Sequence, residues 1–500
     1  MNQNSLIILA IFIACVFSVY SLHINYPLPY HSEEFDHEIM AKETAKTGKI
    51  TAGTNWEIGF SVFFGIINSL LFNNLIDFLV FIPILFALMI SFSSFLLGRH
   101  LFKNNLAGML FALFALMIPS NPGIMGLMFA VPNSMALALT PMLLFLFLKG
   151  TTHKKSALLF IILFAFTTIV HPAFTLILIP IIGFYLLINP KLFERNQFKI
   201  AVGIIALILL LPFFASRIGL EQVNLTHNTL TSISKNLSKV LVWESITQSN
   251  PKFYLTDFLG HYILFLAGIG FGLMLMLRLL IEVKRRKGKT SEMEKDFIVS
   301  KHQIILPIAL IILGFLYMHF NLKNYTFIVP YERMYLELML FFLLNAASGV
   351  FLLWKILSKK TSQEMLKPLS IGFIVLILFL LLTVPFSQQK ELYKNIEVTG
   401  IPAVSWIQEN TKKDSSFIAL PKHSLAIKAF TERKIFASPS TRAGIPDDYG
   451  MESFFMKNCP EKKETIEKTK AEYIFSEKEI SCDSFEKIYD KKEYKIYLVS

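Results

Sequence analysis

The sequence predicts a mainly α-helical protein, a polytopic bundle of about eleven transmembrane helices followed by a small C-terminal α/β domain. Two properties of the 500-residue chain predict this class: an apolar share of 54% and a mean hydropathy of +0.53. Soluble domains are less apolar on average. The third observation is that apolar runs long enough to cross a bilayer recur along most of the chain.

The expected spans are mostly apolar runs that approach the roughly 20 residues a transmembrane helix needs. They cover residues 6–22, 75–97, 106–119, 133–148, 156–170, 173–187, 200–215, 259–281, 304–319, 334–353 and 369–386. A further apolar run, 57–72, is short and ends at polar Asn73 and Asn74. We expect it to lie in the membrane interface or to be re-entrant, because a span there would invert every later loop.

The basic residues predict the orientation of these spans. The formal net charge is +12 at pH 7, and residues 1–388 carry nearly all of the excess. With a cytoplasmic N-terminus, Lys and Arg gather in the inward loops, at 99–103, 149–155, 191–199, 284–289 and 355–367. This excess orients loops and does not indicate nucleic-acid binding. We therefore expect a multi-pass plasma-membrane protein with an extracytoplasmic C-terminus.

The chain is expected to form two domains, a transmembrane domain over 1–388 with an outer loop at 24–74, and an extracytoplasmic domain over 389–500. In the second domain VSWIQENTKKD and ETIEKTKAE predict helices, whereas SFIAL, IFA, EYIF and YKIYLV predict strands. Cys459 and Cys482 lie there. An oxidising compartment would allow a disulfide between them, and two free thiols are the alternative.

Acidic residues crowd the first outer loop, where the sequence reads HSEEFDHE. Ser32 is suited to cap a short helix that opens with Glu33 and Glu34, and Glu33 then shares a face with Asp36 and His37. A carboxylate there could act as a general base on an acceptor hydroxyl, or bind a divalent cation as cofactor.

The same cluster has a purely structural interpretation. Acidic residues in the first turn of a helix are favoured by the macrodipole. The series Lys42, Lys46 and Lys49 suggests a helix that lies on lipid headgroups.

Three basic side chains near span ends are candidates for binding a lipid-linked phosphate. They are Arg333 in VPYERMYLELML, Arg217 in FFASRIG and His171 in TTIVHPAF. The alternative for each is a side chain that reaches ordinary headgroups. The middles of the spans hold almost no ionisable residues, which argues against an ion-coupled transporter.

Layout and motifs together resemble the GT-C superfamily of integral-membrane glycosyltransferases, which includes protein O-mannosyltransferases, aminoarabinose transferases and the catalytic subunit of oligosaccharyltransferase. HSEEFDHEIMAKETAKTGKI is similar to the acidic motif of their first outer loop, with Glu33 and Glu34 where Asp-Glu is common and Gly48 closing the helix. VPYERMYLELMLFFLLNAASG is similar to their late Arg-containing span, and IPAVSWIQENTKKDSSFIALP to the outer domains of prokaryotic members.

The resemblance implies a glycosyltransferase that moves a sugar from a polyprenyl (dolichyl-type) phosphate to a lipid, glycan or protein acceptor on the outer face. It implies a carboxylate base among Glu33, Glu34 and Asp36, and a leaving phosphate held by Arg333 with Arg217 or His171. Because the leading acid is Glu rather than Asp, Asp36 is an alternative base. A transporter or flippase of lipid-linked glycans and a non-catalytic membrane scaffold are the competing functions.

Overall fold

The computed structural model describes residues 28–48, 58–71, 79–120, 125–189, 255–286, 302–323, 331–360, 394–436, 453–491 and 493–499, with short pieces at 9, 12–14, 16–17, 23, 26, 203, 242–244 and 325–327. The described chain is mainly helical and divides into two compact units. The first unit comprises Met1–Ser21, Pro83–Met128 and Pro132–Glu391. The second comprises Leu22–Ile82, Phe129–Val131 and Leu392–Ser500, so the first loop and the C-terminal residues belong to the same unit.

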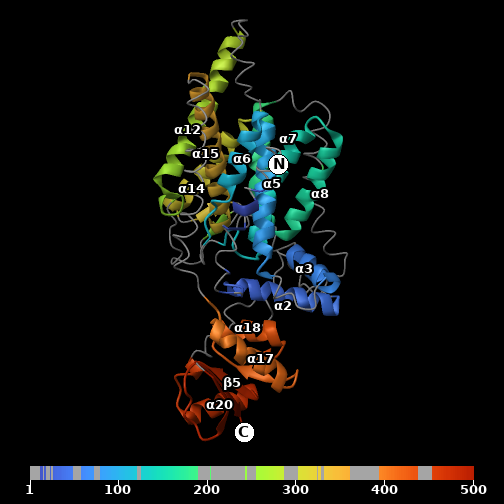
Figure 1. Cartoon of the computed structure of the whole chain (residues 1–500), viewed down its shortest axis with the longest axis vertical. Coiled ribbons are helices and arrows are strands. Elements are labelled where there is room, and N and C mark those ends of the chain that lie inside the picture. The colour runs from blue at the N-terminus through green and yellow to red at the C-terminus, as the bar shows by residue number, and fades with distance from the viewer. Residues whose placement is uncertain are drawn as a thin grey trace. The chain divides into compact units, whose positions relative to one another are not determined.

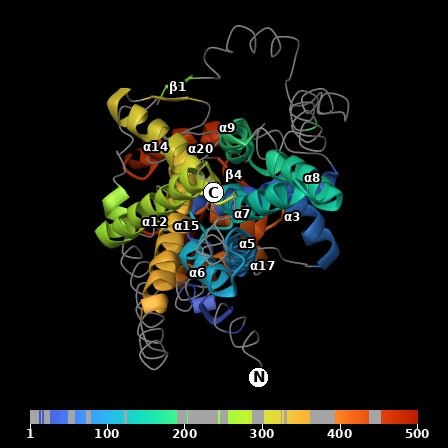
Figure 2. The same cartoon turned by 90° about the horizontal axis from the view of Figure 1, so that it is seen from above.

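The first unit is a bundle of apolar helices that run side by side (Figures 1 and 2). Its long described helices are α5 (Ile82–Phe102), α6 (Asn105–Ala115), α7 (Pro132–Gly150), α8 (Lys154–Val170), α9 (Pro172–Ile188), α12 (Leu255–Arg286), α14 (Ile305–Lys323) and α15 (Tyr331–Lys360). In the described part of the chain, 5 helices are long and apolar enough to cross a membrane: Ile82–Phe102, Pro132–Gly150, Leu259–Leu280, Ile305–Leu322 and Arg333–Ser358.

The described helices can be compared with the expected spans. Those expected at 106–119, 133–148, 156–170, 173–187, 259–281, 304–319 and 334–353 each coincide with a helix, whereas the helix expected at 75–97 begins only at Ile82 and ends at Phe102. This helix continues past the apolar run because Arg99 and His100 fit its last turn, where cations favour the dipole. The expected spans 6–22, 200–215 and 369–386 lie largely outside the described residues.

Small residues let the bundle helices approach closely. A Cβ added at Gly108 of α6 would lie 2.8 Å from the Phe95 carbonyl oxygen of α5. One added at Gly349 of α15 would lie 2.8 Å from the Gly270 nitrogen of α12. Helices in lipid associate through such close packing because no hydrophobic effect drives them together. The stretch NAASG, which ends at Gly349, supplies small residues to this contact.

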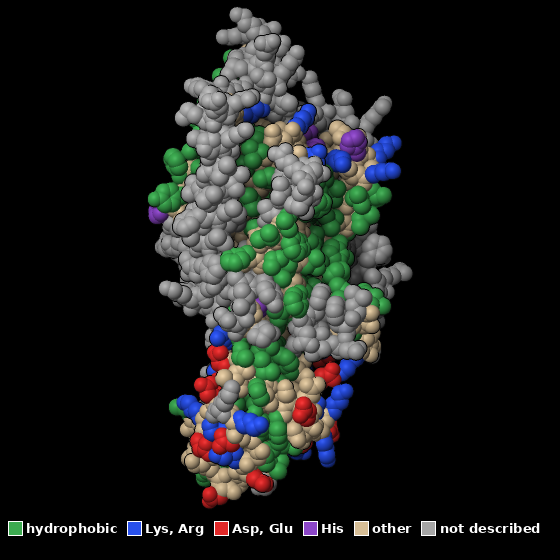
Figure 3. Space-filling view, viewed as in Figure 1, with side chains coloured by type: hydrophobic (Ala, Val, Ile, Leu, Met, Phe, Trp, Pro, Cys, Tyr) green, Lys and Arg blue, Asp and Glu red, His purple; other side chains and the backbone are tan. Residues whose placement is uncertain are grey.

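Two basic loops lie at the same end of the bundle. The His100 ring in the last turn of α5 lies 5.6 Å from the Phe145 ring of α7 between centroids, so the C-terminal ends of these two helices, from which the loops start, are neighbours. Lys and Arg side chains gather at this end, while apolar side chains cover the described flank of the bundle (Figure 3). The loops 99–103 and 149–155 are therefore placed together, as the charge pattern requires.

The second unit contains α2 (Ser32–Thr47) and α3 (Ile58–Leu71), which pack against each other. A Cβ at Gly65 of α3 would lie 3.0 Å from the Ala41 carbonyl oxygen of α2, so glycine permits this close approach. With 14 residues, α3 is shorter than a bilayer requires. Its length fits the interfacial or re-entrant segment expected at 57–72.

The C-terminal part of the second unit is an α/β domain. Its helices are α17 (Ile401–Asn410), α18 (Pro421–Thr431) and α20 (Cys459–Thr469), and its strands are β3 (Ser416–Ile418), β4 (Lys434–Ile435), β5 (Tyr473–Ser476), β6 (Phe485–Lys491) and β7 (Tyr494–Val499). The strands form one sheet in the order β4-β3-β5-β7-β6, with β3 parallel to β4 and β5 and the other pairs antiparallel. Each expected helix and strand overlaps an element of the domain, although α17 ends at Asn410, before TKKD, and β4 shares only Ile435 with IFA. Helix α18 and strand β6 were not predicted.

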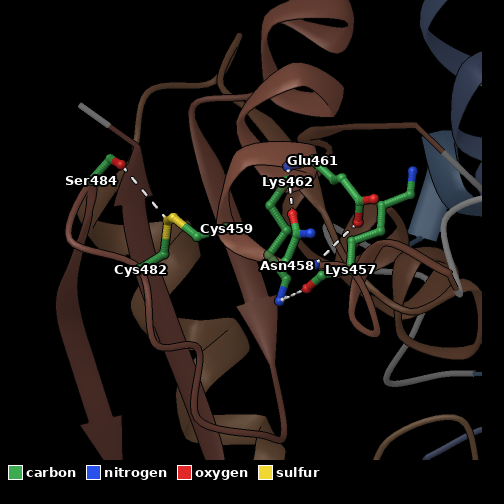
Figure 4. Close-up of a disulfide and its surroundings, with 7 residues drawn as sticks. All are labelled: Lys457, Asn458, Cys459, Glu461, Lys462, Cys482 and Ser484. Atoms are coloured by element: carbon green, nitrogen blue, oxygen red, sulfur yellow. Dashed lines mark hydrogen bonds between the residues drawn. A yellow bond between two sulfur atoms is a disulfide. The ribbon is translucent and has the colours of Figure 1, made fainter.

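A disulfide joins Cys459 and Cys482, with 5.4 Å between their Cα atoms (Figure 4). Of the two alternatives left open by the sequence, the bonded pair is the one found. Asn458 and Glu461 form a capping box at the start of α20 next to it. The bond closes a separation of 23 residues, which in the chain-entropy model corresponds to roughly 3 kcal/mol of stabilisation.

Candidate functional site

Helix α2 carries the acidic cluster, and both of its ends are capped. The N-cap is His31, whose Nδ1 accepts a hydrogen bond from the Glu33 amide at 3.2 Å. The expectation that Ser32 caps this helix is wrong, because only a cap at His31 places Glu34 at the third helical position and closes a capping box. At the other end Gly48 adopts the left-handed conformation, with φ 64°, and ends the helix as expected.

Glu34 binds backbone amides on two segments. Its Oε2 accepts hydrogen bonds from the amides of Tyr30 and His31, each at 2.9 Å. Its Oε1 accepts one from the Ala130 amide at 2.7 Å, which ties α2 to the short segment Phe129–Val131. Since both oxygens are engaged, Glu34 fixes the turn that opens α2.

Burial raises the pKa of the Glu34 carboxyl to about 7, although the three amide hydrogen bonds oppose that change. A folded-state pKa above the ordinary value of 4.5 means that the folded protein holds this proton more tightly than the unfolded chain. The resulting contribution to stability is fully present below pH 4.5 and is lost as the pH rises through 7.

We predict that Glu34→Gln destabilises the protein by about 1–3 kcal/mol, because the new NH₂ group must face at least one backbone N–H. Its deficit relative to wild type should shrink between pH 4.5 and 7, the window given by the raised pKa of Glu34. Thermal unfolding of the full-length protein in detergent at several pH values measures the loss of stability and its dependence on pH. The control is Glu43→Gln on the same helix. The Glu43 carboxyl is partly exposed and lies 3.6 Å from Lys428 Nζ, and a partly exposed ion pair contributes little, so this variant should unfold like wild type. A Glu34→Gln variant as stable as wild type at every pH would contradict this assignment.

The remaining acidic residues occupy the first turns of α2. Glu33 is half-buried, while Asp36 is fully buried at 0% exposure. The His37 ring is also buried and packs edge-on against Phe60 of α3, 5.1 Å between centroids. Glu33, Asp36 and His37 follow the i, i+3 and i+4 spacing expected for one face of a helix.

The lysines of α2 contact protein groups. Lys42 Nζ lies 2.6 Å from Glu38 Oε1 and donates a hydrogen bond to the Ala429 carbonyl oxygen of α18 at 2.8 Å. Lys46 Nζ lies 2.5 Å from Glu432 Oε2. Protein groups on α2, on α18 and at the C-cap of α18 are thus the partners of Lys42 and Lys46, in place of the lipid headgroups that the sequence suggested. Lys49 lies outside the described residues.

Two of the basic candidates are described in the first unit. His171 separates α8 from α9, is buried, and packs edge-on against Phe174 at 5.3 Å between ring centroids. Arg333 is half-buried in the first turn of α15, and within the described part of the chain no hydrogen bond or ion pair to its guanidinium is found. Arg217 lies outside the described residues.

Sequence reasoning about the site missed two carboxylates. Glu38 is buried on α2 beside Asp36 and His37. Glu337, one turn after Arg333 on α15, is 0% exposed, and no hydrogen-bond partner for its carboxyl oxygens occurs among the described residues. For Glu337 the sequence did contain a signal, since it is an acidic residue within an apolar span, and such residues usually mark a functional position.

No metal-binding arrangement is found in the described ranges. Among these described residues, no three His, Cys, Asp or Glu side chains lie close enough together to hold a metal ion.

Comparisons with known proteins bear on the fold. No family model matches the chain, and no curated protein does so either. Among solved structures, 94% of the chain aligns with 67% of the Archaeoglobus fulgidus oligosaccharyltransferase in complex with Zn and sulfate, at a TM-score of 0.59 and 14% identity. Over 99% of its length it also aligns with 98% of ArnT from Cupriavidus metallidurans bound to undecaprenyl phosphate, at a TM-score of 0.57 and 10% identity.

The chain has the fold of the GT-C membrane glycosyltransferases. The resemblance predicted from the acidic motif and the Arg-containing span is thereby confirmed at the level of fold. A third match, archaeal oligosaccharyltransferase AglB from A. fulgidus in complex with an inhibitory peptide and a dolichol-phosphate, covers 94% of this chain and 68% of that one, with a TM-score of 0.57 and 12% identity.

Within this GT-C fold the candidate groups have distinct chemistry. Asp36 and Glu33 offer carboxylates that can accept a proton, and Arg333 offers a planar cation that can bind a phosphate in a bidentate manner. Glu34 and Lys42 are engaged by backbone groups and shape α2 itself.

Proposed function

We propose that this protein is a glycosyltransferase that moves a sugar from a polyprenyl (dolichyl-type) phosphate donor to an acceptor at the outer face of the membrane. The observation that carries the proposal is the fold match over nearly the whole chain to ArnT bound to undecaprenyl phosphate. AglB in complex with a dolichol-phosphate adds a second neighbour whose ligand is a lipid phosphate.

The proposed reaction begins with proton removal from an acceptor hydroxyl. Asp36, or Glu33 next to it, takes this proton as general base. The acceptor oxygen then attacks the anomeric carbon and forms the new glycosidic bond while the bond from that carbon to the phosphate oxygen breaks. The lipid phosphate leaves with the electron pair, and the configuration at the anomeric carbon is inverted.

The leaving phosphate needs a cation to stabilise its charge. We propose Arg333 for this role, with Arg217 and His171 as further candidates. The absence of an ion pair at Arg333 among the described residues supports this choice, since an Arg already paired with a carboxylate binds an anion less well. Its place in the first turn of α15 adds the positive end of the helix dipole.

The proposed topology has about eleven spans, a cytoplasmic N-terminus and an extracytoplasmic domain over 389–500, in the plasma membrane. Residues 1–388 form the transmembrane domain, with 24–74 as its outer loop. The disulfide between Cys459 and Cys482 supports an oxidising location for the C-terminal domain. The common end of the loops 99–103 and 149–155 supports placing both on the cytoplasmic side.

The proposal is tested with purified full-length protein and a panel of radiolabelled polyprenyl-phosphate sugars, supplied with membrane lipids, glycans and peptides as acceptors. We expect label to pass from at least one donor to an acceptor and free polyprenyl phosphate to accumulate in equal amount. Transport of intact lipid-linked glycan across proteoliposomes, without cleavage of the sugar–phosphate bond, would instead indicate a flippase. Binding to none of the donors would indicate a scaffold.

A further inference from the structure

Helix α2 is held by the C-terminal domain through two lysines of very different exposure. The Lys42 side chain is 15% exposed and its partner Glu38 is 0% exposed. The Lys46 side chain is 55% exposed and its partner Glu432 is 33% exposed. Exposed ion pairs contribute little because water screens them, whereas loss of one member of a buried pair leaves a charge without compensation. Lys42 is therefore the lysine that matters for the position of α2.

The Ala429 carbonyl that accepts from Lys42 belongs to the last turn of α18. That helix ends at Thr431, and its C-cap residue Glu432 has a φ of 60° and donates its backbone N–H to the Lys428 carbonyl oxygen. The carbonyls after Lys428 have no helical N–H partner and carry the negative end of the helix dipole. An ammonium group is suited to this place. Lys42 thus joins a buried carboxylate on its own helix to the end of a helix that follows it by nearly 400 residues.

The segment that leads into α2 is also fixed by the C-terminal domain. The Tyr26 hydroxyl donates to the Ile396 carbonyl oxygen at 2.7 Å, and Asn395 Nδ2 donates to the Tyr30 carbonyl oxygen at 3.3 Å. Contacts at Tyr26 and Tyr30 precede the helix, and the contact at Lys42 lies in its second half. Asp36 lies between these anchors along the chain.

We propose that Lys42 is a positioning residue for sugar transfer, through which the C-terminal domain fixes the orientation of α2 and of the Asp36 carboxyl. The inference rests on the proposed function, and it gives the C-terminal domain a part in catalysis. Lys42 acts through Glu38 and the backbone, without contact with the reacting atoms. A helix free to rotate would misplace the base, and errors of about 1 Å in such groups cost up to roughly 100-fold in rate.

The test compares Lys42→Met, Lys42→Arg and Lys46→Met in the full-length protein. Lys42→Met and Lys46→Met each remove one positive charge from α2. A difference between the two variants therefore reports the buried contact of Lys42 and not the change in net charge. For every variant, kcat and the donor KM are measured, together with amide hydrogen exchange over residues 32–47. The exchange experiment reports the order of α2 without any reaction.

We expect Lys42→Met to lower kcat by about 10- to 100-fold with a donor KM within twofold of wild type, and to speed amide exchange in α2. Lys46→Met should match wild type in all three readouts. Lys42→Arg, which keeps the cation, should recover part of kcat. Equal kcat values for Lys42→Met and Lys46→Met, or unchanged exchange in Lys42→Met, would overturn the inference. If the wild-type protein transfers no sugar, both the proposed function and this inference are overturned. If the wild-type protein is active and Lys42→Met has the same kcat, only this inference is overturned.

Discussion

Replacing Asp36 with asparagine is expected to lower kcat for sugar transfer by about 10²–10⁴-fold, the usual contribution of a general base. Asparagine has nearly the same size but cannot accept the proton of an acceptor hydroxyl. Because Asp36 is fully buried, a change of size at this position would disturb packing, so the isosteric variant is the informative one. Radiolabel transfer from the active donor, at saturating donor and acceptor, measures the effect.

The matched control is Glu33→Gln, which neutralises the neighbouring carboxylate. Glu33 is half-buried in the first turn of α2 and lies on the same helix face as Asp36. If Asp36 is the base, Glu33→Gln should keep most of the activity. The opposite result, a large loss with Glu33→Gln and little with Asp36→Asn, would make Glu33 the base. Full activity in both variants would remove the carboxylates of α2 from the proposed mechanism. Size-exclusion profiles and melting temperatures of the variants establish that each is folded.

The second large effect is expected at Arg333. Arg333→Ala should raise the KM for the polyprenyl-phosphate donor by roughly 10- to 100-fold, because charge-assisted hydrogen bonds contribute about 1.5–3 kcal/mol. Arg333→Lys keeps the charge but loses the bidentate fork, so its donor KM should fall between those of wild type and Arg333→Ala. Steady-state kinetics against donor concentration, at fixed acceptor, measure the series.

Arg99→Ala is the control for Arg333, since Arg99 lies in the last turn of α5 at the end of the bundle where the basic loops gather. It should leave the donor KM unchanged. A donor KM for Arg333→Ala equal to that of wild type would count against the phosphate-binding role. A fall in kcat alone would move Arg333 from donor binding to stabilisation of the departing phosphate.

Local signals in the sequence were sufficient for most helices. An apolar run of helical length predicts a helix wherever it lies, because the chain in lipid must satisfy its backbone hydrogen bonds internally. The helices α7, α12 and α15 follow the expected runs for this reason. The end of α2 at Gly48 was equally predictable, since glycine adopts the left-handed conformation at low cost. Helix α18 was missed because PKHSLAIKAF is short and weakly patterned.

Roles within the candidate site were less predictable from sequence. A row of acidic residues at the start of a helix does not reveal which of them binds backbone and which remains for chemistry. Glu34 accepts the amides of Tyr30, His31 and Ala130 and is buried, whereas the neighbouring Glu33 is half-buried. The last of these lies 96 residues away along the chain.

The sequence by itself determined that the chain is a helical membrane bundle with a small α/β domain, and that carboxylates open the helix α2. These features depend on hydrophobic runs and on residues within a turn or two of each other, which the linear order records. Only the tertiary structure decided that Glu34 binds the Ala130 amide, that Lys42 reaches Ala429 and that Cys459 is bonded to Cys482. Such contacts join groups far apart in the chain, and they exist because packing brings these groups within hydrogen-bonding or bonding distance.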